Sequence, residues 1–280
     1  DAENMARWRK LEMAKHHLFY TMIKLKLPLK NRVDDPEGGL AFDFLHPEAL
    51  SPDGTAAPVM TGHASGVITI NLDEADDAQR ERIRTEMGEP YRTLLGHFRH
   101  EIGHFYWDEL IAPQEQRLEA FRALFGDERE DYAEALNRHY AQGPAPDWRE
   151  RCISAYASAH PWEDFAETWA HYLHIVGTLQ TAAAIGIRLD AGASTLRDTD
   201  VVPRDDYRDE PIGRVLADWA ALSQGFNRVN RSMGLGDLYP FTITQPVQRK
   251  LAFLHEIITR APLTTEQQVA LALAPGDETA

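Results

Sequence analysis

The sequence predicts a mainly α-helical protein of the α+β class with one small antiparallel β element. Apolar residues recur at helical spacing over the first 25 residues, around residues 91–110, and in long runs after residues 161 and 212. The β signal is confined to a short run at residues 40–44 and a turn-centred, β-branched pattern over residues 59–72. We find no internal repeat and no low-complexity linker, so one unit with a large core is expected.

The helices are bounded by ordinary start and stop signals. Pro28 follows the first helix, Gly126 separates two helices, and Pro161 suits the first position of a helix, where its missing N–H costs nothing. The expected helices cover residues 1–25, 73 to about 88, 91–110, two within 113–142, 148–159, 161 to about 186, 212–233 and 246–260. Residues 189–211 are polar and aperiodic and predict an exposed loop.

The β-branched pattern predicts a hairpin immediately upstream of the third helix. Its strands would cover residues 59–61 and 67–72, joined by a turn at residues 62–66. The outer strand is a candidate edge on which an extended peptide could pair its backbone. The alternative is that this strand completes a small sheet.

Composition excludes several kinds of partner. The chain has 29 Lys and Arg against 44 Asp and Glu, a formal charge of −15, which argues against nucleic acid and against an anionic membrane surface. No apolar run reaches about 18 residues, so no transmembrane helix is expected. Cys152 is the only cysteine. It cannot form an internal disulfide, and this favours a cytoplasmic protein in which Cys152 is a buried apolar residue.

Residues 100–104 read His-Glu-x-x-His inside a helical pattern. Positions four apart lie on one face of a helix, so His100 and His104 can offer two imidazoles to one metal ion. Glu101 then lies beside the metal as a candidate general base for an activated water. A metzincin would continue this motif with Gly at position 107 and His at position 110, but Trp107 and Leu110 stand there, which excludes that class.

A carboxylate on a second helix is the remaining source of a third ligand. Glu163 and Glu167 lie four residues apart on one face of an apolar helix, where a dication would offset the cost of burying them. We assign Glu163 to the metal. Glu167 would accept a hydrogen bond from the far ring nitrogen of His100 or His104. Two alternatives stay open, namely that Glu167 is the ligand, or that both are solvent-exposed carboxylates.

The residues around both motifs resemble a known family. The Glu-x-Phe-Ala-Glu of residues 163–167, after His-Glu-x-x-His, resembles the gluzincin arrangement of toxin proteases such as lethal factor. More closely, segments 96–108, 158–172, 230–234 and 237–241 look like a bacterial family of zinc-binding metallopeptidases, over nearly the whole chain. Members of that family usually carry an N-terminal zinc ribbon of paired cysteines, which this sequence lacks.

This resemblance implies a zincin-like metallopeptidase fold in a single unit at residues 1–275. Residues 1–188 would form the catalytic part with both motif helices, residues 189–275 a helical C-terminal part, and residues 276–280 a loose tail. The chain begins with Asp1, and its start shows neither an initiator Met nor a signal peptide. We therefore expect that upstream sequence is missing.

The expected function is that of a zinc-dependent peptidase acting on a peptide or protein substrate. One zinc per chain would be held by His100, His104 and Glu163, with Glu101 as general base. Similarity to gluzincins of the lethal-factor kind suggests Tyr156 as the donor to the oxyanion. Alternatives are that it is a core tyrosine or that the donor is one of three histidines: His160, His171 and His174.

Two other functions fit the same motif. One is a non-catalytic, zinc-stabilised peptide- or protein-binding protein, although a structural site has no need of Glu101 beside an open coordination position. The other is a zinc hydrolase of a non-peptide amide. Arg99, directly before the motif, is expected at the surface or paired with a carboxylate. The oligomeric state is not determined by these patterns.

Overall fold

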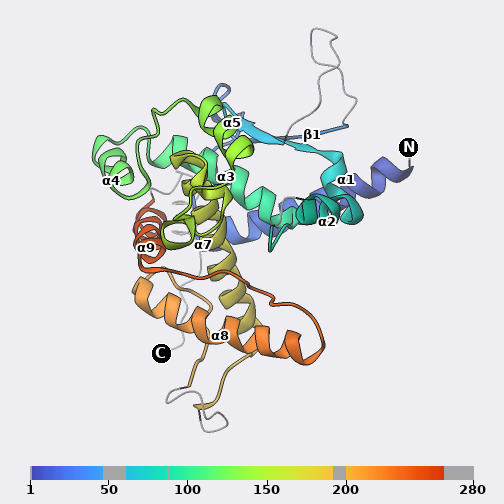
Figure 1. Cartoon of the computed structure of the whole chain (residues 1–280), viewed down its shortest axis with the longest axis vertical. Helices are drawn as coiled ribbons and strands as arrows, with labels where there is room; N and C mark the ends of the chain where they lie inside the picture. The colour runs from blue at the N-terminus through green and yellow to red at the C-terminus, as the bar shows by residue number, and fades with distance from the viewer. Residues whose placement is uncertain (1, 47–60, 87–88, 192–199, 262–280) are drawn as a thin grey trace.

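The computed structural model describes residues 2–46, 61–86, 89–191 and 200–261. The fold is mainly helical with one small three-stranded sheet, as the sequence predicts. Figure 1 shows that α7 crosses α3 in the upper part of the molecule and runs down to α8. The helices are α1 (Ala2–Lys24), α2 (Asp77–Glu86), α3 (Leu94–Leu110), α4 (Glu115–Phe125), α5 (Tyr132–Gln142), α6 (Trp148–Arg151), α7 (Pro161–Ala184), α8 (Ile212–Ser232) and α9 (Gln245–Thr259), with 3-10 helices η1 (Leu72–Ala75) and η2 (Tyr156–Ser158).

The two helices that carry the motifs, α3 and α7, each begin at a residue whose side chain caps the helix. Thr93 accepts a hydrogen bond from Gly96 N and starts α3 at Leu94, three residues later than the pattern predicts. His160 accepts a hydrogen bond from Trp162 N, and Pro161 occupies the first turn of α7. Both helices therefore begin at a capped residue upstream of their motif.

The expected helix over residues 148–159 is wrong, because the chain breaks into α6 and η2. Ser154 Oγ accepts a hydrogen bond from Ala157 N at 3.1 Å and donates one to Glu167 at 2.6 Å. Lys250 Nζ donates to Arg151 O at 2.7 Å. Serine in such a position offers the backbone an alternative to the helical hydrogen bond, and here the alternative connects the break to α7.

The sheet has the strand order β1 (Ala41–Leu45), β3 (Val67–Asn71), β2 (Gly62–Ala64). The predicted antiparallel hairpin is confirmed for β2 and β3, and β1 adds to β3 in parallel, with Ala41 opposite Val67. The turn is tighter than expected, because Ser65 and Gly66 both have positive φ, at 47° and 79°, as a two-residue hairpin turn requires. Residues 62–64, expected in the turn, therefore form β2; residues 59–60 lie outside the described residues.

The core lies around the crossing of α3 and α7, where Gly103 allows close approach. A Cβ at Gly103 would lie 3.0 Å from Ala166 Cα and 3.2 Å from Trp169 Cβ. Trp169 is fully buried and stacks on Tyr106 of α3 with ring centroids 4.9 Å apart. This close contact fixes the position of the residues that precede and follow Gly103.

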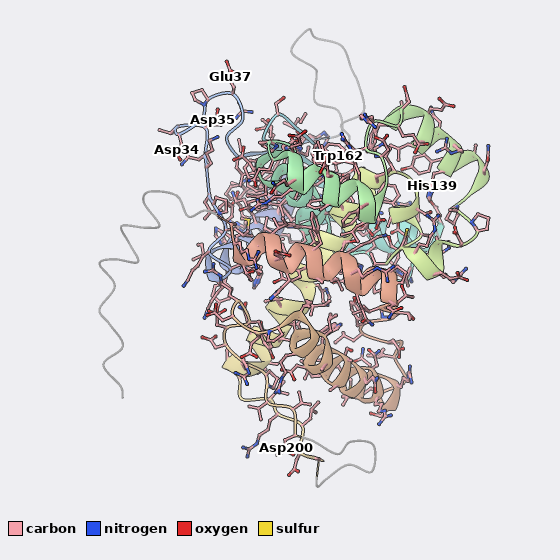
Figure 2. All side chains as sticks on the ribbon, turned by 90° about the vertical axis from the view of Figure 1, so that its left-hand side faces the viewer. Asp34, Asp35, Glu37, His139, Trp162 and Asp200 are labelled. Carbon is pink, nitrogen blue, oxygen red and sulfur yellow. The ribbon has the colours of Figure 1, made fainter. Side chains whose placement is uncertain are left out.

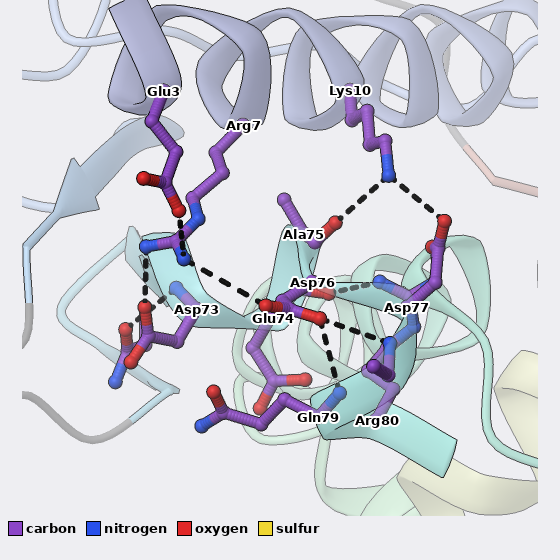
Figure 3. Close-up of polar contacts among 12 residues, drawn as sticks. Glu3, Arg7, Lys10, Asp73, Glu74, Ala75, Asp76, Asp77, Gln79 and Arg80 are labelled. Carbon is purple, nitrogen blue, oxygen red and sulfur yellow. Dashed lines mark hydrogen bonds and ion pairs between the residues drawn. The ribbon is translucent and has the colours of Figure 1, made fainter. Parts of the chain in front are cut away.

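Polar contacts attach α1 to the segment that follows the sheet (Figure 3). Arg7 Nη1 lies 2.9 Å from Asp73 Oδ1, and Lys10 Nζ lies 2.8 Å from Asp77 Oδ2 and 3.3 Å from Ala75 O. On the other face of α1, Leu11, Leu18 and Met22 are fully buried. The N-terminal helix is thus an integral part of the core.

The C-terminal helices α8 and α9 pack along α7, and α9 reaches the first turn of α7. Asp164 and Lys250 form an ion pair at 2.5 Å, and both side chains are about 95% buried. Asp200, in the loop before α8, lies at the end of the molecule away from Trp162 (Figure 2). The expected tail at residues 276–280 lies outside the described residues. Within the described ranges, no helix combines the length and apolarity that crossing a membrane requires.

Candidate metal centre

The two histidines of α3 and the first glutamate of α7 converge on one point. His100 Nε2 lies 3.2 Å from His104 Nε2 and 3.0 Å from Glu163 Oε2, and His104 Nε2 lies 3.6 Å from Glu163 Oε1. Among the described residues, these three form the cluster of histidine, cysteine and acidic side chains that could hold a metal ion.

The spacing of these atoms fits a tetrahedral zinc ion. Zinc bonds of about 2.0–2.1 Å to nitrogen or oxygen place two ligand atoms about 3.3 Å apart, which matches the three separations. Glu163 is 1% exposed, and its Oε2 forms no hydrogen bond within the described part of the chain although His100 Nε2 is 3.0 Å away. A buried carboxylate oxygen without a donor is costly unless a cation takes that place.

Glu167 lies beside the cluster rather than in it. Its Oε1 is 2.7 Å from His100 Nδ1, and its Oε2 accepts a hydrogen bond from Ser154 at 2.6 Å. Both oxygens are therefore engaged, and the hydrogen bond at Nδ1 leaves His100 Nε2 directed towards Glu163. The exposed-carboxylate alternative is wrong, because the Glu163 and Glu167 side chains are 1% and 21% exposed.

The charges of the cluster stabilise one another. Burial alone would raise the pKa of Glu163 and Glu167, but the His100 imidazole between them outweighs it and holds the pKa of each below the usual range. Burial likewise opposes the charge of His100, whereas the two carboxylates raise its pKa well above the usual value. His104 differs, since burial lowers its pKa to about 3. A cation bound here would replace the proton of His100.

Three further side chains hold the cluster, and the sequence patterns did not indicate them. Tyr132 of α5 donates a hydrogen bond from its hydroxyl to Glu163 Oε1 at 2.7 Å. Trp162 lies against the His104 ring at 4.0 Å between centroids, and His63 of β2 stacks on His104 at 6.5 Å. Trp162 directly precedes Glu163, but neither Tyr132 nor His63 stands at a spacing that points to the motif.

Glu101 lies at the edge of a cleft, beside the candidate metal site. It is 8% exposed and lines a cleft of 830 Å³ together with His100 and Tyr156. Burial raises the pKa of Glu101 to about 7. A carboxylate with a pKa near neutrality can both accept and release a proton at physiological pH.

The four candidates for an oxyanion donor are placed differently. Tyr156 lines the cleft with its ring 6.0 Å from the His100 ring, and burial raises the pKa of its hydroxyl, so it stays a neutral donor. His160 caps α7 and contacts Glu130 O, so both of its ring nitrogens are engaged. The other two histidines contact aromatic hydroxyls: His171 that of Tyr239 and His174 that of Tyr91.

Arg99 departs from its expected place. It is 8% exposed and lines the cleft, and the structure shows no ion pair for it in the described ranges. The prediction of a surface or carboxylate-paired arginine is therefore wrong. The sequence position of Arg99, next to His100, does not predict that the side chain is buried. Burial at this position depends on how α3 packs against α1 and α7.

A helical chain in which a His-Glu-x-x-His helix meets a glutamate of a second helix has the plan of a gluzincin-like metallopeptidase. Residues 4–257 match the family described as "Putative zinc-binding metallo-peptidase", and the chain belongs to that family. It is 45% identical over 254 residues to an uncharacterized protein of Mycobacterium bovis and to one of Mycobacterium tuberculosis, covering 91% of this chain and 70% of each relative. No solved structure matches the chain.

Proposed function

We propose that the protein is a zinc-dependent peptidase that hydrolyses peptide bonds, with one zinc per chain at His100, His104 and Glu163. The observation that carries this proposal is the convergence of these three ligands beside Glu101 at the edge of an open cleft. A purely structural zinc site has no need of a buried carboxylate with a raised pKa next to it.

Each residue has a distinct role in this proposal. A zinc ion held by His100, His104 and Glu163 would act as a Lewis acid towards the scissile carbonyl and would lower the pKa of a water molecule. Glu101 takes the proton of the attacking water and delivers it to the leaving amine. Glu167 holds the His100 ring in the tautomer that directs Nε2 to the metal, through the 2.7 Å contact with Nδ1.

Tyr156 is the proposed donor to the oxyanion. Its ring lies beside that of His100, and its hydroxyl remains protonated because burial raises its pKa. A preorganised donor at the point where negative charge develops stabilises the transition state more than the ground state. Tyr132 has a different task in this proposal, since its hydroxyl already donates to Glu163.

A polypeptide substrate is supported by the size of the cleft and by the sheet. A cleft of 830 Å³ has room for several residues of an extended chain. The strand β2 has a free edge, because it pairs only with β3 among the described strands, and His63 connects β2 to His104. An extended peptide could therefore pair with β2 beside the metal.

The test is the Glu101→Gln variant, assayed by cleavage of a peptide library with zinc-loaded protein. The substitution removes the base and leaves the ligands, so we expect full zinc content and a loss of hydrolysis on the order of 10²–10⁴-fold. Glu163→Gln should lose the zinc itself. Glu119→Gln, at an exposed position on α4, is the matched control and should behave as wild type. Equal cleavage by wild type and the Glu101→Gln variant would refute the role of Glu101 as general base.

A further inference from the structure

Arg99 is a buried cation for which the described structure provides no anion. It stands one residue before His100 on α3 and is 8% exposed. Its Nε is fully buried without a hydrogen-bond partner, and no ion pair of Arg99 is present in the ranges that the structure covers. A guanidinium stays protonated at neutral pH even when it is buried, so Arg99 carries its positive charge here. Burying an unpaired charge lowers the stability of the folded protein, so a buried arginine without a partner suggests a functional role.

Two other arginines of the cleft wall, Arg80 and Arg92, contrast with Arg99. Arg80 pairs with Asp77 and reaches Glu74 O (Figure 3). Arg92 lies 3.1 Å from Glu89 Oε2 and 3.7 Å from Glu74 Oε1. These two guanidinium groups are thus paired with carboxylates of the protein, whereas no carboxylate of the described residues pairs with Arg99.

The neighbours of Arg99 in the cleft are aromatic and histidine side chains, and no carboxylate of the described residues forms an ion pair with it. Tyr91, His171 and His174 line the same part of the cleft. Burial, and after it the charge of Arg99, lowers the pKa of His174 to about 3, and His171 also titrates well below neutrality. Both histidines are therefore neutral. Tyr91 keeps its hydroxyl within reach of His174 Nδ1 and Thr93 Oγ1.

The opposite side of the guanidinium offers no acid either. A second hollow of 190 Å³ lies between α1 and α7 behind Arg99, and the described residues that line it include no aspartate or glutamate. Arg99 Nη2 lies there 3.4 Å from the place that a Cβ on Gly177 would take, so the absence of a side chain at Gly177 gives the guanidinium its room. No carboxylate of the described residues therefore faces the guanidinium on either side.

We propose that Arg99 is a subsite for a carboxylate group of the substrate, at the cleft wall next to the metal centre. This inference rests on the proposed peptidase function. An arginine fork binds a carboxylate through two parallel hydrogen bonds, and a dry, low-dielectric position strengthens them. The carboxylate is either the free C-terminus of a peptide or an acidic side chain close to the scissile bond, and both present the same group to Arg99.

Matched peptides distinguish these two sources. Wild type and the Arg99→Met, Arg99→Lys and Arg228→Met variants are assayed on peptides with a free or an amidated C-terminus, and with Glu or Gln at each position. Arg99→Met should lower kcat/KM roughly 10- to 100-fold for the preferred carboxylate peptide and leave its amide counterpart unchanged. Arg99→Lys keeps the charge without the fork and should fall in between. Arg228, exposed on α8, is the control.

A second measurement separates substrate binding from a structural role. Removing an unpaired buried charge should raise the melting temperature of the Arg99→Met variant, with zinc content unchanged, whereas a structural arginine would lower it. The inference is overturned if wild type cleaves peptides without regard to carboxylates, or if Arg99→Met keeps the wild-type preference.

Failure of the proposed function has a different signature. If wild type cleaves no peptide, binding of the same peptides is measured by calorimetry with the zinc-loaded protein. Arg99-dependent preference for the acid over the amide would then support the subsite without the peptidase. Equal binding of acid and amide would refute the subsite as well.

Discussion

Each candidate ligand is held by a neighbouring side chain, and the neighbours differ in kind. Glu167 contacts Nδ1 of His100, Tyr132 donates to Glu163, and the Trp162 ring lies against His104. A metal site with its ligands already oriented loses less entropy when the ion binds. The partners of the ligands should therefore influence zinc affinity almost as strongly as the ligands.

Tyr132→Phe tests this influence. The change removes one hydroxyl and its hydrogen bond to Glu163 Oε1, so we expect zinc affinity to fall roughly 10- to 100-fold. Tyr156→Phe, by contrast, should keep zinc affinity and reduce kcat, because its hydroxyl is proposed to act on the oxyanion. Competition with a chromogenic chelator measures the affinity, and Tyr20→Phe, exposed on α1, serves as control. Unchanged affinity in the Tyr132→Phe variant would show that the contact does not orient Glu163.

At the scale of single residues, the sequence predicts the site residues that share one helix, but it does not predict the residues that another helix contributes to the same site. His100 and His104, like Glu163 and Glu167, are related by a local period of four, which any helix converts into a shared face. Tyr132 reaches Glu163 across 31 residues, a distance that α5 and its loop determine and that no periodicity contains. Whether a charged side chain such as Arg99 has an ion-pair partner likewise depends on tertiary packing, which no local pattern contains.

At the scale of secondary structure, the crossing of α3 and α7 sets the relative positions of the candidate metal ligands. Both ligand sets lie on long helices that meet at Gly103, inside the motif itself. Helices of this length were predicted from apolar periodicity because burial on more than one side leaves a clear pattern. The parallel addition of β1 was not predicted, since strand partners are chosen by long-range packing.

Gly103→Ala should separate the two helices. A Cβ would come within 3.0 Å of Ala166 Cα, which is backbone and cannot move aside without a shift of α7. We expect a loss of about 1–3 kcal/mol in the free energy of unfolding, together with weaker zinc binding. Gly213→Ala, in the first turn of α8 with no atom within 4 Å, is the control and should be neutral or slightly stabilising. Urea unfolding and zinc titration give the two quantities, and wild-type values in both would contradict the steric argument.

The molecule as a whole carries a formal charge of −15 and buries several neutral histidines. His171 is 8% exposed, and burial lowers its pKa to about 4, with Arg99 of α3 acting in the same direction and Glu167 of α7 opposing it. Tyr239 contacts its Nδ1 from the segment before α9. The unfolded state takes up a proton at this side chain near pH 6.5, whereas the folded state does so only near pH 4.

Stability should therefore decrease as the pH falls from about 6.5 to about 4. A single such histidine contributes up to about 1.4 kcal/mol per pH unit, with stability present above the unfolded pKa and lost on acidification. His171→Gln should flatten this slope while retaining a partner for Tyr239. Urea unfolding at several pH values, with a chelator present to remove metal effects, measures it; His16→Gln, exposed on α1, is the control. An unchanged slope in the His171→Gln variant would assign the acid sensitivity to other groups.

The buried pair of Asp164 and Lys250 joins residues 86 positions apart, and Asp164 directly follows the candidate ligand Glu163. Loss of either charge would leave the other charge buried and unpaired, next to the first turn of α7. Lys250 does not line the cleft, yet its ion pair with Asp164 places it next to the candidate ligand Glu163 in sequence and space, so we expect few substitutions to be tolerated at this position. Positions 164 and 250 are therefore expected to covary among related sequences, which would couple the evolution of α9 to that of α7.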